Sequence, residues 1–330
     1  MKNILNRLIN NEMLSKEEAK EVLVNISNGS YNPSQIAAFL TVYMMRSISI
    51  DELAGFREAL LELCVRIDLS AYNTIDLVGT GGDGKDTFNI STLASFITAG
   101  AGVKVAKHGN YGVSSITGSS NVMESLGIKF SNDHDFIEKC VDQAGISILH
   151  APLFHPAMKN VGPIRKELGV RTIFNILGPM INPSFPKNQL LGVFNLELAR
   201  MYGYLYQNTD KNFTIVHALD GYDEISLTGP SKIITSSTER MLNPEDFGVR
   251  IIQQSEIEGG KTIDESAQMF IDIISGKGTE AQNNVVCANA AMAIATVTGC
   301  TPLEGFEQAK ESLFSGKGHA ALKKLQELSK

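Results

Sequence analysis

Short apolar runs alternate with segments of helical periodicity between residues 75 and 235, and this alternation constrains the fold more than any other feature of the chain. A strand, helix, strand order favours parallel strands, because a crossover helix returns the chain to the same edge of the sheet. The sequence therefore predicts an α/β domain over residues 71–330, with a largely parallel central sheet flanked by helices. The expected strands are Ile75–Val78, Val103–Ala106, Ile146–Leu149, Leu190–Phe194, Phe213–Ala218 and Lys232–Thr235.

The first seventy residues carry helix-start signals in place of strand patterns. Ser15–Glu18 and Ser49–Glu52 match the capping box, and Asn32 stands before a proline at the first helical position. We therefore predict a small all-helical domain over residues 1–70, followed by a linker near residues 70–74. The chain becomes helical and amphipathic again from about residue 262, where Asn283–Ala295 is rich in small residues that suit close packing against the sheet.

Composition limits the classes of partner and compartment. The net charge of −7 argues against nucleic acid, because affinity for a phosphate backbone comes mainly from clustered Lys and Arg. No apolar run approaches the roughly 18 residues that a membrane span requires, and the start of the chain lacks the apolar stretch of a signal peptide, so we expect a cytoplasmic protein. Its four cysteines are far apart in sequence and are expected to be reduced, mostly buried thiols: Cys64, Cys140, Cys287 and Cys300.

A glycine-rich segment, Gly79–Gly84, joins the first expected strand to a helix that opens at Asn89–Thr92. Glycines let backbone amides approach a phosphate closely, and a helix start favours negative charge. Thr87 adds a hydroxyl donor, but a tight strand-to-helix turn explains the glycines equally well. The spacing formally matches G-x-G-x-x-G, yet Lys107 stands where a dinucleotide site requires an acid, and no G-K-[ST] completes a Walker loop.

A second loop with phosphate-binding character follows the next expected strand. Lys107–Asn110 supplies a cation, and the small-residue stretch Gly112–Ser120 supplies hydroxyl and amide donors. Two such loops at the ends of neighbouring strands predict one crevice. For His108, a structural hydrogen-bonding role is at least as well supported as a chemical one. The spacing of His150 and His155 places them on different helix faces, so no metal cluster is expected.

Adjacent carboxylates, Asp223 and Glu224, lie on a loop after the strand expected at 213–218. Acids on a turn are usually only solvated. The functional alternative is Mg²⁺, which prefers oxygen ligands and commonly links carboxylates to substrate phosphates.

The stretch His150–Pro183 is the most distinctive string in the chain. Together with GTGGD at residue 79, KHGN at residue 107 and DGYDE at residue 220, it resembles the anthranilate phosphoribosyltransferases over essentially all 330 residues. The resemblance implies an enzyme of tryptophan biosynthesis that uses magnesium and transfers the phosphoribosyl group of phosphoribosyl diphosphate (PRPP) to the amine of anthranilate. It also implies a hinged cleft, a homodimer formed through the helical domain, and a helical contribution from about residues 157–180.

The same resemblance assigns the site residues. Those implied for PRPP are Gly79, Gly82, Asp83, Thr87, Asn89, Ser91, Thr92, Lys107 and Ser119. Those implied for Mg²⁺ are Ser91, Asp223 and Glu224, and those implied for anthranilate are Gly79, His108, Asn110 and Arg165. An arginine suits the anthranilate carboxylate, because a planar guanidinium can bind it bidentately. No catalytic general base is expected, since an aromatic amine is already neutral at pH 7.

Three positions depart from the common family pattern. Tyr111 stands where Arg is frequent, Ile116 where Lys is frequent and Asn121 where Asp is frequent. These changes remove two positive charges from the phosphate loop.

Two other functions remain as alternatives. A pyrimidine nucleoside phosphorylase shares the implied fold and takes phosphate and a nucleoside, but Arg165 and the string at 150–183 disfavour it. A non-catalytic relative that binds nucleic acid or another protein is expected to have a basic surface and degraded metal motifs. This chain has a net charge of −7 and retains Asp223 and Glu224.

Overall fold

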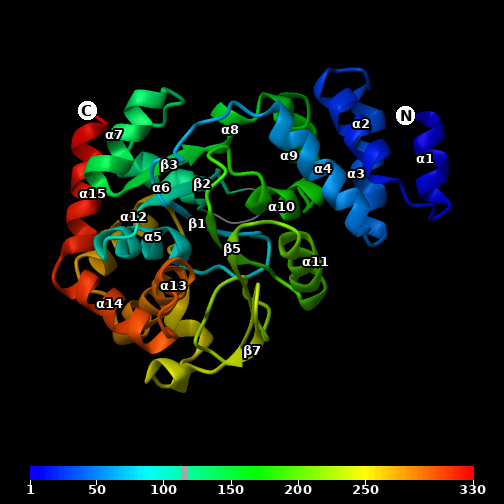
Figure 1. Ribbon diagram of the computed structural model, residues 1–330. Coiled ribbons are helices and arrows are strands. Elements are labelled where there is room, and N and C mark those ends of the chain that lie inside the picture. Colours follow the sequence, from blue (N-terminus) through cyan, green and yellow to red (C-terminus); the bar gives the residue numbers. More distant parts are fainter. Residues whose placement is uncertain (113–116) are drawn as a thin grey trace.

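The computed structural model describes residues 1–112 and 117–330 and has a seven-stranded sheet at its centre (Figure 1). The strand order is β3-β2-β1-β4-β5-β6-β7; the first five strands of this order are parallel, and β6 and β7 are antiparallel to their neighbours. The prediction of a largely parallel sheet is thus confirmed. The strands are β1 (Ile75–Gly79), β2 (Val105–Gly109), β3 (Ile146–His150), β4 (Asn188–Gly192), β5 (Asn212–Ala218), β6 (Ser231–Thr235) and β7 (Glu239–Leu242).

Two strands are shifted from the predicted positions, and one was not predicted. β2 begins two residues later than its apolar run. β4 begins two residues earlier than its apolar run, because Asn188 and Gln189 pair with Ile75 and Asp76 of β1. Apolar runs report burial, whereas the strand bounds depend on which backbone groups pair. β7 is a short edge strand whose first three residues are exposed, so it has no apolar run to reveal it.

A helical bundle lies at one side of the molecule, together with the N-terminus (Figure 1). It consists of α1 (Lys2–Ile9), α2 (Lys16–Ser27), α3 (Pro33–Met45) and α4 (Ile50–Leu63). The capping boxes predicted at Ser15 and Ser49 are formed, and Asn32 caps α3. The segment after β3 and α8 (Ala151–Phe154) packs its apolar side chains into the core of this bundle. That segment comprises η1 (Pro156–Asn160), α9 (Gly162–Leu168), α10 (Ile173–Leu177) and η2 (Gly178–Met180).

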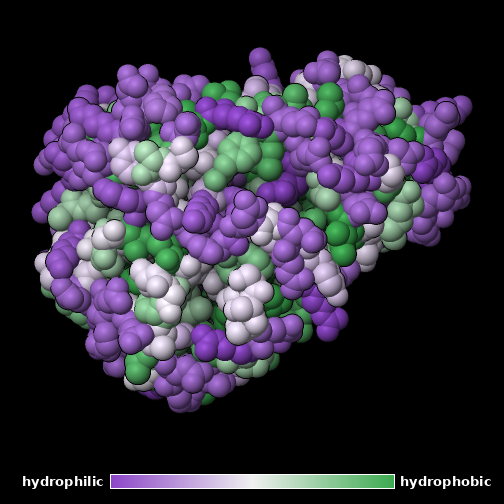
Figure 2. Space-filling model, in the orientation of Figure 1, coloured by the Kyte–Doolittle hydropathy of each residue, from purple (hydrophilic) through white to green (hydrophobic). Residues whose placement is uncertain are grey.

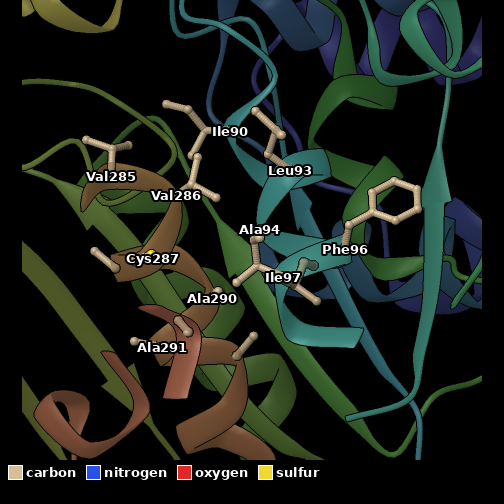
Figure 3. Close-up of a cluster of buried hydrophobic side chains, with 14 of the residues drawn as sticks. Ile90, Leu93, Ala94, Phe96, Ile97, Val285, Val286, Cys287, Ala290 and Ala291 are labelled. Atoms are coloured by element: carbon tan, nitrogen blue, oxygen red, sulfur yellow. The ribbon is translucent and has the colours of Figure 1, made fainter. Parts of the chain in front are cut away.

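Helices cover the sheet on the side away from the bundle. Figure 3 shows α5 (Ile90–Gly100) against α13 (Glu280–Thr298), where Leu93 and Ile97 meet Val286 and Ala290 in the main core. α13 packs against β1, β4 and β5 and is buried nearly all round, so the small residues serve close packing as predicted, although the helix is not amphipathic. The remaining elements are α6 (Ser119–Ser125), α7 (His134–Ala144), α11 (Leu196–Gln207), η3 (Pro244–Phe247), η4 (Gln254–Ile257), α12 (Ile263–Ile274), α14 (Pro302–Phe314) and α15 (Lys317–Leu328).

The described surface is mainly hydrophilic, with apolar atoms in separate patches on the face that Figure 2 shows. No single helix among residues 1–112 and 117–330 is long and apolar enough to cross a membrane; α13 and α14 pass that test only as a pair bent by 117°. The four cysteines are free, and Cys300 alone of them is not buried.

A buried carboxylate holds the helical bundle together. Glu52 is fully buried and is paired with Arg46, while its oxygens also accept hydrogen bonds from the Leu14 amide at 3.0 Å, the Ser49 amide at 2.8 Å and the Tyr43 hydroxyl at 2.8 Å. Burial alone would raise the pKa of Glu52, but these donors outweigh it and the pKa lies below its ordinary value. One acid therefore joins the ends of three helices.

Replacing Arg46 with alanine should leave Glu52 buried without a counter-ion. We expect the free energy of unfolding to fall by about 3–5 kcal/mol, measured by urea denaturation at pH 7. The folded pKa of Glu52 is lowered, so its stabilising contribution is complete above the unfolded pKa of about 4.3 and is lost as pH falls through the folded pKa. Arg7→Ala, which removes a surface pair with Glu18, is the control and should cost far less. Equal losses in the two variants would contradict the role given to Glu52.

Candidate active site

The carboxyl ends of the parallel strands meet at one edge of the sheet, and the glycine-rich segment follows the central strand β1 at this edge. Gly81, Gly82 and Gly84 have φ values of +62°, +69° and +76°, a region that favours glycine. Among the described residues, the amides of Gly82 and Gly84 have no hydrogen-bond partner. The segment thus presents backbone donors to solvent directly before the N-terminus of α5, as an anion site requires.

The two predicted acids face the segment from the turn after β5. Asp223 Oδ2 accepts a hydrogen bond from the Gly81 amide at 2.6 Å, and Glu224 Oε1 accepts one from the Ser91 amide at 3.0 Å. Ser91 lies in the first turn of α5, so a carboxylate already occupies part of the helix start that we expected to receive phosphate. The acids, the glycines and α5 are therefore in direct contact, although they come from distant parts of the sequence.

Glycine is required where this turn touches the sheet. A Cβ on Gly79 would overlap the Asp223 carboxylate, and a Cβ on Gly192, at the end of β4, would overlap the Asp223 carbonyl oxygen. Sequence analysis missed Gly192, because a glycine at the end of a strand has several ordinary explanations. The close approach places the carboxylate of Asp223 directly over the ends of β1 and β4.

Asn289 fixes the other side of the acid-bearing turn and was also missed. Its side chain on α13 accepts from the Ile225 amide at 3.0 Å and donates to the Ile225 carbonyl at 2.8 Å and to the Val285 carbonyl at 2.9 Å. An asparagine in a helix of small apolar residues was the only available sign. The buried Asn289 side chain thereby holds Ile225, the residue after Glu224, in place.

Burial disfavours the charged forms of the acids at this site. Burial and the neighbouring Asp83 raise the pKa of Asp223 to about 7. Burial with the neighbouring Asp223 and Asp83 raises the pKa of Glu224, and burial raises the pKa of Asp83. A small cavity of about 20 Å³ lies at these groups and is lined in part by Gly79, Ser91, Gly192, Asp223, Glu224 and Asn289. A divalent cation would neutralise the acids and fit their oxygen donors.

Lys107 is the buried cation of the site. It lies in β2, next to β1, and is 2% exposed. Its ammonium donates to the Leu77 carbonyl and lies 3.5 Å from the Ser91 hydroxyl. Burial lowers its pKa, while Asp76 and the two loop acids oppose that change. The point charge that the sequence predicted is thus held behind the glycine-rich segment and α5.

Within residues 1–112 and 117–330, no group of three or more His, Cys, Asp or Glu side chains has the arrangement of a complete metal site.

Arg165, on α9, is half-buried, and its polar atoms are only partly satisfied. It donates to the Asn175 side chain at 3.2 Å, its Nε has no partner among the described residues, and its guanidinium lies 5.5 Å from the centre of the Phe174 ring. Burial lowers the pKa of Arg165 to about 10. A buried guanidinium with an unused donor is suited to a carboxylate ligand.

His108 is buried at the end of β2, and its ring lies 5.2 Å from that of His155. Neither ring nitrogen of His155 has a partner among the described residues, nor does Nε2 of His108. Burial, with His155 nearby, lowers the pKa of His108 well below its usual value, so both rings are neutral at pH 7. They offer polar but uncharged atoms.

Asp76 positions His108 from the middle of β1. This buried carboxylate accepts from the His108 amide at 3.0 Å and from the Asn182 side chain at 2.8 Å, and Asn182 also donates to the Ala106 carbonyl at 2.9 Å. Burial raises the pKa of Asp76 to about 6. An acid inside an apolar strand was a signal that sequence analysis did not use.

The other predicted residues are placed less directly. Thr92 is almost fully buried in α5, Thr87 forms a backbone bridge with Glu258, and Asn89 donates to the Thr117 carbonyl at 3.4 Å. The Ser119 hydroxyl donates to the carbonyl of the exposed Asn110 at 3.3 Å.

Of the three unusual positions, Tyr111 follows β2 and Asn121 lies in the first turn of α6. Asn121 accepts from the Gly112 and Gly118 amides at 3.1 and 3.0 Å and so closes the loop. Tyr111 packs its ring against His150 with 4.7 Å between ring centres. Ile116 lies outside the described residues.

Comparison with known proteins covers the whole chain. Residues 2–64 match the glycosyl transferase family, helical bundle domain, and residues 71–319 match the glycosyl transferase family, a/b domain. The chain is 81% identical over 329 residues to the anthranilate phosphoribosyltransferase of Flavobacterium johnsoniae, with 100% of both chains covered.

Solved structures agree. The chain resembles the crystal structure of anthranilate phosphoribosyltransferase from Thermus thermophilus with a TM-score of 0.90 and 31% identity, covering 98% of each chain. It resembles the Saccharomyces cerevisiae enzyme in complex with PRPP and Mg with a TM-score of 0.89 and 27% identity, covering 98% of this chain and 96% of that one. It resembles a complex of the yeast enzyme with 4-fluoroanthranilate with a TM-score of 0.87 and 26% identity, covering 98% of this chain and 96% of that one.

Replacing Asn289 with alanine should free the turn that carries the acids. The Ile225 amide and carbonyl would lose their buried partner, so we expect the free energy of unfolding to fall by about 2–4 kcal/mol. Asn284→Ala, at a half-exposed position of the same helix, is the matched control. Urea denaturation measures both, and a loss below about 1 kcal/mol for Asn289→Ala would show that the turn does not depend on this side chain.

Proposed function

Since the chain belongs to the anthranilate phosphoribosyltransferases of the glycosyl transferase family, we propose that its site holds the two substrates on opposite sides of the reacting carbon. The reaction, a step of tryptophan biosynthesis, transfers the phosphoribosyl group of PRPP to the amine of anthranilate and releases diphosphate. The observation that carries the assignment of residues is that Asp223 accepts from the Gly81 amide and Glu224 from the Ser91 amide at one sheet edge. This function replaces the pyrimidine nucleoside phosphorylase and non-catalytic alternatives.

PRPP is proposed to bind with its diphosphate on the glycine-rich segment and the start of α5. The unpartnered amides of Gly82 and Gly84 support this orientation, and Lys107 supplies a fixed positive charge behind them. The further PRPP contacts proposed from the family pattern are Gly79, Asp83, Thr87, Asn89, Ser91, Thr92 and Ser119.

We propose Ser91, Asp223 and Glu224 as the residues that hold Mg²⁺. The three residues line one small cavity, and the raised pKa values of the acids fit a site that is completed by a cation. When bound, Mg²⁺ supplies positive charge that stabilises the departing diphosphate. The Gly81 and Ser91 amides keep the two carboxylates aimed at the glycine-rich segment.

Anthranilate is proposed to bind between the end of β2 and α9. The unused Nε of Arg165 can donate to its carboxylate, and the neutral His108 with Asn110 and Gly79 would line the ring and amine. The amine of anthranilate is a nucleophile without prior loss of a proton, so no side chain is assigned as general base. Positioning and fixed charges then account for catalysis.

Three predictions about the whole protein complete the proposal. The division into domains near residue 70 stays a prediction, as does the cytoplasmic location. A homodimer formed through the helical bundle is supported by exposed apolar side chains there, which include Ile9, Met13 and Met45.

Adding the protein to anthranilate, PRPP and Mg²⁺ should abolish anthranilate fluorescence as the amine is consumed. The variant Asp223→Asn with Glu224→Gln should lower turnover at least about 100-fold and change the dependence on magnesium concentration, because the cation loses its charged ligands. Asp246→Asn with Glu245→Gln, an acidic pair on the distant η3, is the control. Wild-type rates from the first double variant would exclude the metal assignment.

Arg165→Ala should raise the KM for anthranilate by about 10-fold or more and leave the KM for PRPP within a few-fold of wild type, because only the anthranilate carboxylate loses its partner. Lys166→Ala, the exposed neighbour on α9, should change neither value. Initial rates with each substrate varied in turn provide the measurement. A rise confined to the KM for PRPP would place Arg165 in the other half of the site.

A further inference from the structure

Arg171 lies across the glycine-rich segment, although no feature of the sequence singled it out. It belongs to the short connection between α9 and α10, in the segment that packs on the helical bundle. Its side chain runs directly over Gly82: a Cβ at Gly82 would overlap Arg171 Cδ, would lie 3.0 Å from Cγ and would lie 3.6 Å from Nε. An anion on the Gly82 amide would therefore be within reach of the Arg171 guanidinium.

The guanidinium of Arg171 is held only weakly in this structure. It lies over the Phe194 ring, with 5.1 Å from Cζ to the ring centre, and Phe194 follows the end of β4 at the same sheet edge. Within the described ranges, no carboxylate is at ion-pair distance from it, and the residue is exposed. An exposed cation–π contact is weaker than charge-assisted hydrogen bonds from an arginine to a phosphate.

We propose that Arg171 is a binding residue for the diphosphate of PRPP, which it contacts from the side of the helical bundle. This inference rests on the proposed PRPP site. On binding, the guanidinium exchanges the Phe194 ring for phosphate oxygens, while its aliphatic stem stays on Gly82. Arg171 thereby links the segment that carries Arg165 to the segment that binds the leaving group.

The charge balance of the site favours this role. Asp83 belongs to the glycine-rich segment, Asp223 accepts from its Gly81 amide, and Glu224 accepts from the Ser91 amide at the start of α5. Of the nearby cations, Lys107 is buried and donates to a backbone carbonyl, and Lys85 lies over the Tyr222 ring. Neither Tyr111 nor Ile116 carries a charge. A multiply charged diphosphate gains from further cations on its open side, and Arg171 provides one there.

Inorganic pyrophosphate with Mg²⁺ is the probe for this role. Arg171→Met keeps the aliphatic stem on Gly82 and removes the charge, so calorimetry should show pyrophosphate binding about 10-fold weaker than in wild type. In steady-state assays, the KM for PRPP should rise and the KM for anthranilate should not. Arg171→Lys should retain part of the affinity, because it restores the charge without the planar fork.

Arg66→Met is the matched control. Arg66 is also exposed and stacked on a phenylalanine, with 4.8 Å from Cζ to the ring centre of Phe185, but Phe185 precedes β4 and so lies toward the opposite edge of the sheet. This variant should bind pyrophosphate as wild type does. If Arg171→Met fails to fold, as judged by its thermal transition, Arg171→Gln replaces it.

Pyrophosphate affinity of Arg171→Met or Arg171→Gln within two-fold of the Arg66→Met control would overturn the proposal and leave Arg171 with a packing role on Gly82 and Phe194. Wild-type protein that binds no pyrophosphate would instead contradict the proposed diphosphate site itself.

Discussion

The turn that carries Asp223 and Glu224 lies so close to the ends of β1 and β4 that only glycine fits at positions 79 and 192. This contact organises the rest of the site. It brings the Asp223 carboxylate to the Gly81 amide and the Glu224 carboxylate to the start of α5. Asn289 holds the turn from the opposite side through the core helix α13. A parallel sheet supplies the edge, but the glycines allow the acids and the amides of the glycine-rich segment to share it.

The site is built at a cost in electrostatic energy. Burial is unfavourable for each charged group of the site. It raises the pKa values of the acids, lowers the pKa of Lys107, and leaves the Arg165 guanidinium with an unused donor. Each becomes favourable when a partner of opposite charge arrives: a divalent cation, a diphosphate or a carboxylate. In such a site the buried charges are already in place before the ligands bind. The stability that it requires comes from the apolar core around α5 and α13 and from the Glu52 network of the bundle.

Much of the fold could be predicted from the sequence because its signals are local. Capping residues before α2, α3 and α4 and the apolar runs of the inner strands act within a few positions of where they stand. The glycine-rich segment, Lys107 and the two acids could likewise be found, since loops at the carboxyl ends of parallel strands must meet. The supporting residues could not. Asp76, Gly192 and Asn289 act through contacts with distant segments, and the sequence does not show which segment each of them meets.

The central claim is that one sheet edge holds the diphosphate between glycine amides and paired acids. A crystal structure with PRPP and Mg²⁺ tests this claim most directly. The account predicts diphosphate oxygens at the Gly82 and Gly84 amides, with magnesium bridging them to Asp223 or Glu224. Diphosphate bound away from residues 79–92 would contradict the account. So would a magnesium ion that neither Asp223 nor Glu224 contacts, directly or through a water molecule.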